Sequence, residues 1–131
     1  MEISKSALRR PSKLHSDEII ATSVTNVMHE PRGACGRLSI DMGSGLSVKV
    51  NYVLGTYVGR GDIKPNIMHI RTHNVPDRVI EERKDLAAAL AEAAATIAAS
   101  KGYVLESSIP WMARAISLLP DNPHQYREGA D

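Results

Sequence analysis

The segment NVPDRVIEERKDLAAALAEAAATIAASKG, which runs from Asn74 to Gly102, decides the predicted fold. Alanine has the highest intrinsic helix propensity, and it dominates the second half of this segment. Asn74 is placed to cap the first amide groups, and Pro76 suits the first helical turn. Gly102 suits the left-handed position that follows a last turn. We therefore predict one continuous helix over residues 74–102.

The larger apolar side chains of this helix fall on a single narrow stripe, which is made by Val79, Leu86, Leu90 and Ile97. Such a stripe is typical of a helix that packs on one neighbouring layer, here a sheet. Alanine on both sides of the stripe also lets another backbone approach closely. A self-pairing helix at a homodimer interface is therefore the alternative interpretation.

Two runs of alternating residues precede the helix, and the sequence Gly43-Ser44-Gly45 separates them. Alternation on both sides of a glycine turn is the sequence pattern of a β-hairpin. Gly55 is expected to form a bulge or a bend in the second strand. The residues predicted to face inward are Leu38, Ile40, Met42, Leu46, Val48, Val50, Tyr52 and Leu54.

Residues 67–73 also alternate and predict a third strand. The inner face of this strand is expected to carry Met68, Ile70 and Thr72. Its outer face is then expected to carry His69, Arg71 and His73. A short apolar run at residues 103–105 predicts an edge strand, and a last helix is predicted to end at Pro120.

Residues 16–30 fit a helix or a strand. Ser16 suits an N-cap, and Ile20, Val24 and Val27 fall at helical spacing. The many β-branched side chains of this segment favour a strand instead. With a helix here, the predicted fold class is α+β: an antiparallel three- to four-stranded sheet with the long Ala-rich helix and shorter helices packed on one face.

Length and composition predict one domain. The chain has 131 residues, of which 43% are hydrophobic and 24% charged, as in ordinary globular proteins. We expect a single domain at residues 16–120, between a flexible basic tail at residues 1–15 and a flexible C-terminal tail at residues 121–131. The single cysteine, Cys35, excludes an intramolecular disulfide and predicts a reducing, cytoplasmic compartment. No apolar run is long enough to span a membrane.

The candidate catalytic and metal-ligating residues do not form a recognisable motif. On a strand, His69 and His73 lie about 13 Å apart at ~3.3 Å per residue, which is too far for them to share one metal ion. Cys35 lies near His29 in the sequence and gives a weak hypothesis of a Cys–His enzyme. We therefore predict no enzymatic activity, no metal and no cofactor.

The preferred functional prediction is a non-enzymatic protein-binding adaptor or inhibitor, of the kind encoded by phages or mobile elements. It would present either the polar face of the sheet or the alanine-rich helix to a protein partner, and a homodimer is the alternative use of that helix. The predicted partner-binding residues are Arg37, Lys49, Asn51, His69, Arg71 and His73.

The alternative prediction is a nucleic-acid-binding module. Residues 1–15 and residues 32–73 each carry an excess of basic side chains, whereas the remaining segments are acidic. Basic residues that neutralise phosphates would make such binding steeply dependent on salt. The residues predicted for this function are Arg9, Arg10, Lys13, Lys49 and Arg71.

Overall fold

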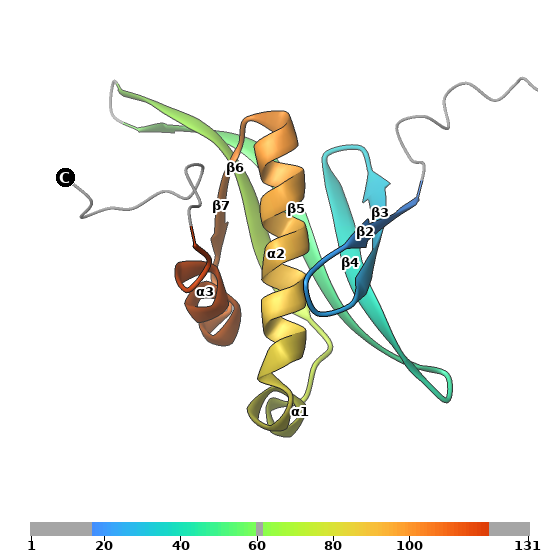
Figure 1. Ribbon diagram of the computed structural model, residues 1–131. Helices are drawn as coiled ribbons and strands as arrows, with labels where there is room; N and C mark the ends of the chain where they lie inside the picture. Colours follow the sequence, from blue (N-terminus) through green and yellow to red (C-terminus); the bar gives the residue numbers. More distant parts are fainter. Residues whose placement is uncertain (1–16, 60–61, 121–131) are drawn as a thin grey trace, which may run out of the picture.

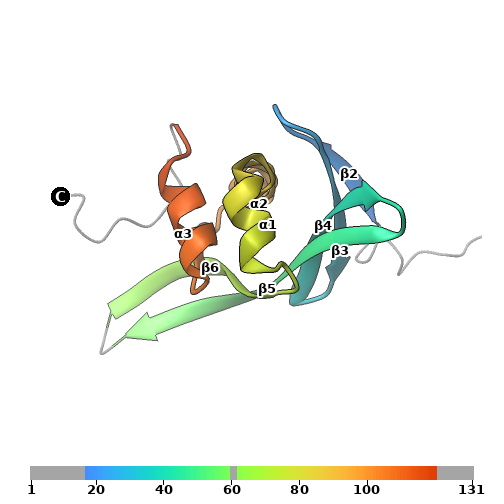
Figure 2. The same cartoon turned by 90° about the horizontal axis from the view of Figure 1, so that it is seen from below.

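In the computed structural model, which describes residues 17–59 and 62–120, one curled sheet wraps around a long helix (Figures 1 and 2). The strands are β2 (Glu18–Ala21), β3 (Asn26–Arg32), β4 (Cys35–Gly43), β5 (Leu46–Gly59), β6 (Asp62–His73) and β7 (Val104–Ser107). The helices are α1 (Asp77–Glu82), α2 (Lys84–Lys101) and α3 (Pro110–Ser117). All three helices lie on the concave side of the sheet (Figure 2).

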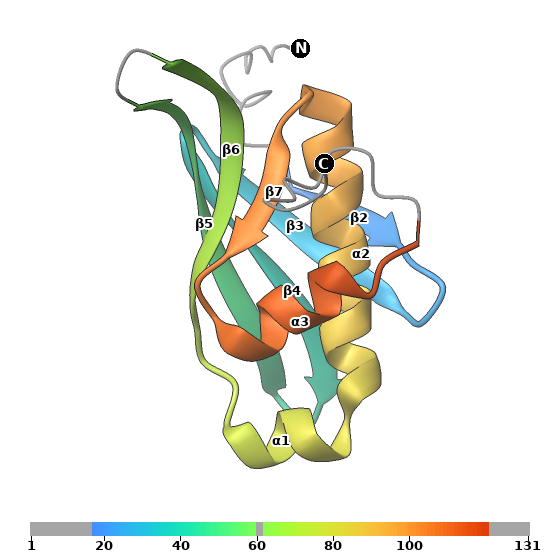
Figure 3. The ribbon, with the colours of Figure 1, turned by 90° about the vertical axis from the view of Figure 1, so that its left-hand side faces the viewer.

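The predicted sheet was too small, and the prediction that it is purely antiparallel was wrong. The six strands lie in the order β2-β3-β4-β5-β6-β7 and form a half-barrel rather than a three- to four-stranded layer. Neighbouring strands are antiparallel except for β6 and β7, which are parallel. The chain reaches β7 by crossing the concave side through α1 and α2, and a crossover of this kind returns a strand in the parallel direction (Figure 3).

The helix predicted at residues 16–30 is wrong, because this segment forms the hairpin of β2 and β3. Thr22 closes the turn: its Oγ1 accepts hydrogen bonds from the amides of Val24 and Thr25, each at 3.1 Å. The β-branched residues that weakened the helix prediction therefore act according to their strand preference. Ser16, the predicted cap, lies outside the described residues.

The central hairpin is confirmed, but Met42 and Leu46 beside its turn, which were predicted to face inward, are exposed. Leu38 pairs with Val50 across β4 and β5, and both are fully buried against the helix. The turn at Gly43-Ser44-Gly45 has positive φ at all three residues, which glycine adopts without a steric penalty. Gly55 does not form the expected bulge, because it pairs regularly with Ile67.

The predicted helix over residues 74–102 is interrupted at Arg83, where α1 ends and α2 begins. The Arg83 guanidinium makes two hydrogen bonds to the Asp85 carboxylate, at 3.0 and 2.9 Å, and these lower the pKa of Asp85. Gly102 adopts the predicted left-handed conformation, with φ 72°. Asn74 does not cap the helix; its side chain instead bonds to the backbone of Ser47 and Lys49 in β5.

Helix α2 fills the hollow of the half-barrel. Its buried positions extend well beyond the predicted stripe, because the sheet curls around the helix and α3 covers another side (Figures 2 and 3). Alanine is small enough to fit on all these sides. The alanine-rich surface that suggested helix self-pairing is thus largely used within the chain. The buried residues of α2 are Leu86, Ala87, Ala89, Leu90, Ala91, Ala93, Ala94, Ile97 and Ala98.

A β-bulge at Arg71 changes the face of the sheet to which the last side chains of β6 point. Tyr52 pairs with Ile70, but the next residue back along β5, Asn51, pairs with Thr72, so Arg71 is an extra residue. Met68 and Ile70 face the core as predicted. Thr72 was predicted to face inward but is turned to the convex face, beside Asn51. The single inserted residue shifts the alternation by one position from there on.

Candidate functional site

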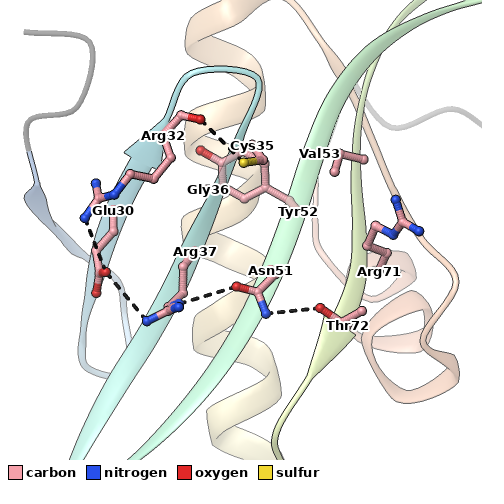
Figure 4. A pocket seen from close by; sticks show the side chains of 10 residues that line it. All are labelled: Glu30, Arg32, Cys35, Gly36, Arg37, Asn51, Tyr52, Val53, Arg71 and Thr72. Carbon is pink, nitrogen blue, oxygen red and sulfur yellow. Dashed lines mark hydrogen bonds and ion pairs between the residues drawn. The ribbon is translucent and has the colours of Figure 1, made fainter. Parts of the chain in front are cut away.

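The convex face of the sheet carries an open hollow of about 530 Å³ over β3, β4, β5 and β6 (Figure 4). Three arginines and one glutamate surround it, so the local charge is positive. Val53 adds an apolar wall, and no helix covers this side of the sheet among the described residues (Figure 2). The polar side chains that line the hollow are Glu30, Arg32, Cys35, Arg37, Asn51, Arg71 and Thr72.

A row of hydrogen bonds crosses the hollow at the level of Asn51. The register places Arg37, Asn51 and Thr72 side by side on β4, β5 and β6. Arg37 Nε donates to Asn51 Oδ1 at 3.4 Å, and Asn51 Nδ2 donates to Thr72 Oγ1 at 3.0 Å (Figure 4). These bonds fix the side-chain amide of Asn51, and Arg37 Nη1 lies 3.8 Å from Glu30 Oε1 on β3.

The three arginines differ in how far this chain already neutralises them. Arg32 is paired with Asp17 at 3.2 Å and lies 3.8 Å from Glu30, and it also donates to the Pro31 carbonyl. Among the residues that the structure describes, Arg37 has only the 3.8 Å contact with Glu30 as an ion pair. Arg71 is exposed and makes no hydrogen bond or ion pair within residues 17–59 and 62–120. Arg37 and Arg71 are therefore the cations with donors to spare.

Five of the six predicted partner-binding residues lie on the convex face. Arg37, Asn51 and Arg71 line the hollow, and Lys49 lies two residues before Asn51 on the same face of β5. His69 also faces this side, but its Nδ1 is bonded to Glu106 Oε2 of β7 at 2.5 Å. Sequence reasoning missed Glu30, Arg32 and Thr72. Glu30 lies in the segment that was predicted as a helix, and Arg32 follows directly after it. Thr72 was predicted to face inward, but the bulge turns it to the convex face.

His73 was predicted on the outer face, and this is wrong. The bulge turns it toward the helices, where its ring stacks edge-to-face on Trp111 of α3 with centroids 5.1 Å apart. Its Nδ1 accepts a hydrogen bond from the amide of Val75 at 2.9 Å. His73 therefore helps to fasten the end of β6 to α3 and has no place in the convex-face hollow.

A buried polar network lies on the concave side, directly behind the hollow. His29 and Tyr52 are only 3% and 1% exposed, and the Tyr52 hydroxyl lies 2.6 Å from His29 Nε2. His29 Nδ1 is 3.0 Å from a carboxylate oxygen of Glu18 on the edge strand β2. Burial, with smaller contributions from Cys35 and Glu18, raises the pKa of Tyr52 to about 12. Tyr52 therefore stays a neutral phenol at ordinary pH. Its hydroxyl is bonded to the buried ring of His29.

The structure does not bring Cys35 and His29 together. Cys35 is exposed on the convex face, where its thiol contacts the Arg32 carbonyl at 3.4 Å, whereas His29 is buried on the concave face. His69 and His73 also lie on opposite faces. Among the described residues there is no group of three or more side chains placed to hold a metal ion. Arg9, Arg10 and Lys13 lie outside the described residues.

No protein-family model, curated protein or solved structure matches the chain. The sequence-based descriptions of an inhibitor, an adaptor or a phage-type protein therefore have no support from relatives, and we withdraw them. The prediction of a purely antiparallel sheet is withdrawn because β6 and β7 are parallel. Within the part of the chain that the structure describes, no helix has the length and apolar character needed to span a membrane.

Proposed function

We propose that this protein is a binding protein that presents the convex face of its sheet to a protein partner. The observation that carries the proposal is the ordered row of Arg37, Asn51 and Thr72 beside an open hollow. Polar groups with fixed directions and an apolar wall are what a protein–protein interface uses to set specificity. Arginine is also enriched among the residues that dominate binding energy.

The distribution of the helices supports the choice of face. On the concave side α2 and α3 already cover the sheet, and the buried His29 is bonded to both Tyr52 and Glu18. On the convex side several side chains of mixed character stay partly exposed, including Lys49 and Val53. On the convex face, Arg37 and Arg71 offer a partner donors that no described residue uses.

A photo-crosslinking amino acid placed at Lys49, in the full chain and in its native cells, tests the proposal. The matched control places the same amino acid at Ala88, which is exposed on the outer side of α2. We expect a discrete covalent adduct with another protein from position 49 and none from position 88. Adducts from position 88 alone would show that the helix side, and not the sheet, carries the interface.

A further inference from the structure

We infer that the convex-face hollow is an anion-binding site for an extended acidic peptide segment, with Arg37 and Arg71 as the two residues that bind its carboxylates. This inference rests on the proposed function and names the chemistry of the partner. A guanidinium group presents its donors in a planar fork that matches a carboxylate, and such charge-assisted pairs are stronger than neutral hydrogen bonds.

The two arginines stand on either side of a neutral polar row. Figure 4 shows the Arg37 guanidinium at one end of the row, Asn51 and Thr72 in the middle, and Arg71 beyond them. Arg37 and Thr72 are two strands apart, so their backbones are separated by about 10 Å at ~4.8 Å per strand. Both arginine side chains have several rotatable bonds, so each guanidinium can turn toward the row to meet a carboxylate.

This spacing selects the ligand. In an extended peptide, side chains two residues apart point to the same face and lie about 7 Å apart at ~3.4 Å per residue. Two acidic residues with one residue between them would therefore place one carboxylate at each arginine. The peptide backbone between them would lie over the Asn51 amide and the Thr72 hydroxyl, which are hydrogen-bonding groups.

Charge complementarity favours a peptide over a nucleic acid. Glu30 lies 3.8 Å from both Arg32 and Arg37, and Glu106 lies on the same face beside His69. A phosphate backbone needs a continuous basic track, and these carboxylates would interrupt it. An isolated pair of carboxylates needs only the local positive charge that Arg37 and Arg71 supply.

The test uses a fluorescein-labelled peptide with two glutamates separated by one serine, titrated with the full chain at low ionic strength. The double substitution Arg37→Gln with Arg71→Gln removes both cations. Its matched control, Arg78→Gln with Arg114→Gln, removes the same charge from exposed positions on α1 and α3. We expect the first variant to weaken binding at least about tenfold, because a hydrogen bond to a charged group is worth ~1.5 kcal/mol or more and 1.4 kcal/mol is a factor of ten. The control should stay within about twofold of the wild type.

Three results would overturn the inference. The first is equal weakening by both double variants, which would indicate non-specific attraction. The second is equal binding of a peptide with a single glutamate. The third is tighter, Arg37-dependent binding of a single-stranded oligonucleotide of matched charge, which would make the hollow a phosphate site. If peptide binding fails while the crosslink from position 49 persists in the Arg37→Gln, Arg71→Gln variant, the proposed function stands and only its acidic partner is wrong.

Discussion

The concave and convex faces of the sheet are built from alternate residues of the same strands, yet they use their polar groups differently. On the concave face, Tyr52 and His29 are enclosed and bonded to each other, with Glu18 completing the network at the edge. On the convex face, Arg37 and Arg71 keep donors that no residue within 17–59 and 62–120 uses. The difference shows that a polar group serves the fold where its partners are internal, and is available for binding where they are not.

The largest expected contrast is between neighbouring residues on opposite faces. Leu38 is fully buried on the concave face, so Leu38→Ala should lower the free energy of unfolding by about 3 to 4 kcal/mol through lost burial and a cavity. Arg37→Gln, one residue earlier, should change it by less than about 0.5 kcal/mol, as for most surface substitutions. Urea unfolding followed by circular dichroism measures both values. Similar losses for the two variants would remove the distinction between the faces.

Gly36→Ala tests how tightly the concave network is enclosed. A Cβ atom at Gly36 would lie 2.3 Å from the Tyr52 hydroxyl oxygen, so the buried ring would have to move away from His29. We expect a loss of about 2 to 3 kcal/mol from overpacking and the disturbed hydrogen bond. Gly55→Ala is the control, because nothing lies within 4 Å of its added Cβ, and it should be nearly neutral. Equal stability of the two variants would show that Tyr52 has free space.

Tyr52→Phe sharpens the role of the buried hydroxyl. Below pH 10 it should cost about 1 to 2 kcal/mol, because His29 Nε2 loses its only partner among the described residues. The folded-state pKa of Tyr52 is raised from 10.0 to about 12, chiefly by burial, so folding favours the protonated phenol. The stability from this preference is present below pH 10 and is lost as the pH rises toward 12.

The pH measurement compares wild type and Tyr52→Phe by urea unfolding at pH 9 and at pH 11 to 12. The wild-type advantage over the variant should shrink across this interval, since the variant has no phenol to ionise at position 52. A constant advantage would mean that Tyr52 ionises equally easily in the folded and unfolded chains.

The smallest effect is expected from the two histidines that the sequence pattern placed on one face. His73→Ala should cost about 1 kcal/mol, because it removes the ring contact with Trp111 and the acceptor of the Val75 amide. It should also shift the emission of Trp111, the single tryptophan of the chain. His69→Ala, on the convex face, should leave that emission unchanged. A shift in both variants would contradict the reversal at the bulge.

Much of the convex site was predictable, and the reason is the period of two. Alternation along residues 36–54 places Arg37, Lys49 and Asn51 on the face opposite Leu38 and Val50, and it needs no knowledge of neighbouring strands. The same rule failed at Thr72 and His73, because one inserted residue moves every later side chain to the other face. No glycine or proline marks that bulge, so nothing in the local sequence indicates it.

The sequence by itself determined the local structures whose causes are local: the hairpin around Gly43-Ser44-Gly45, the alanine-rich helix and its glycine end at Gly102. Only the tertiary structure decided that the hairpin of β2 and β3 extends the sheet beside β4 and that β7 lies parallel to β6. Both depend on backbone hydrogen bonds and packing that join separate segments of the chain, and such contacts override weak local preferences. The arginine-lined hollow belongs to the second group, because β3, β4 and β6 contribute its charges and only the folded sheet brings them together.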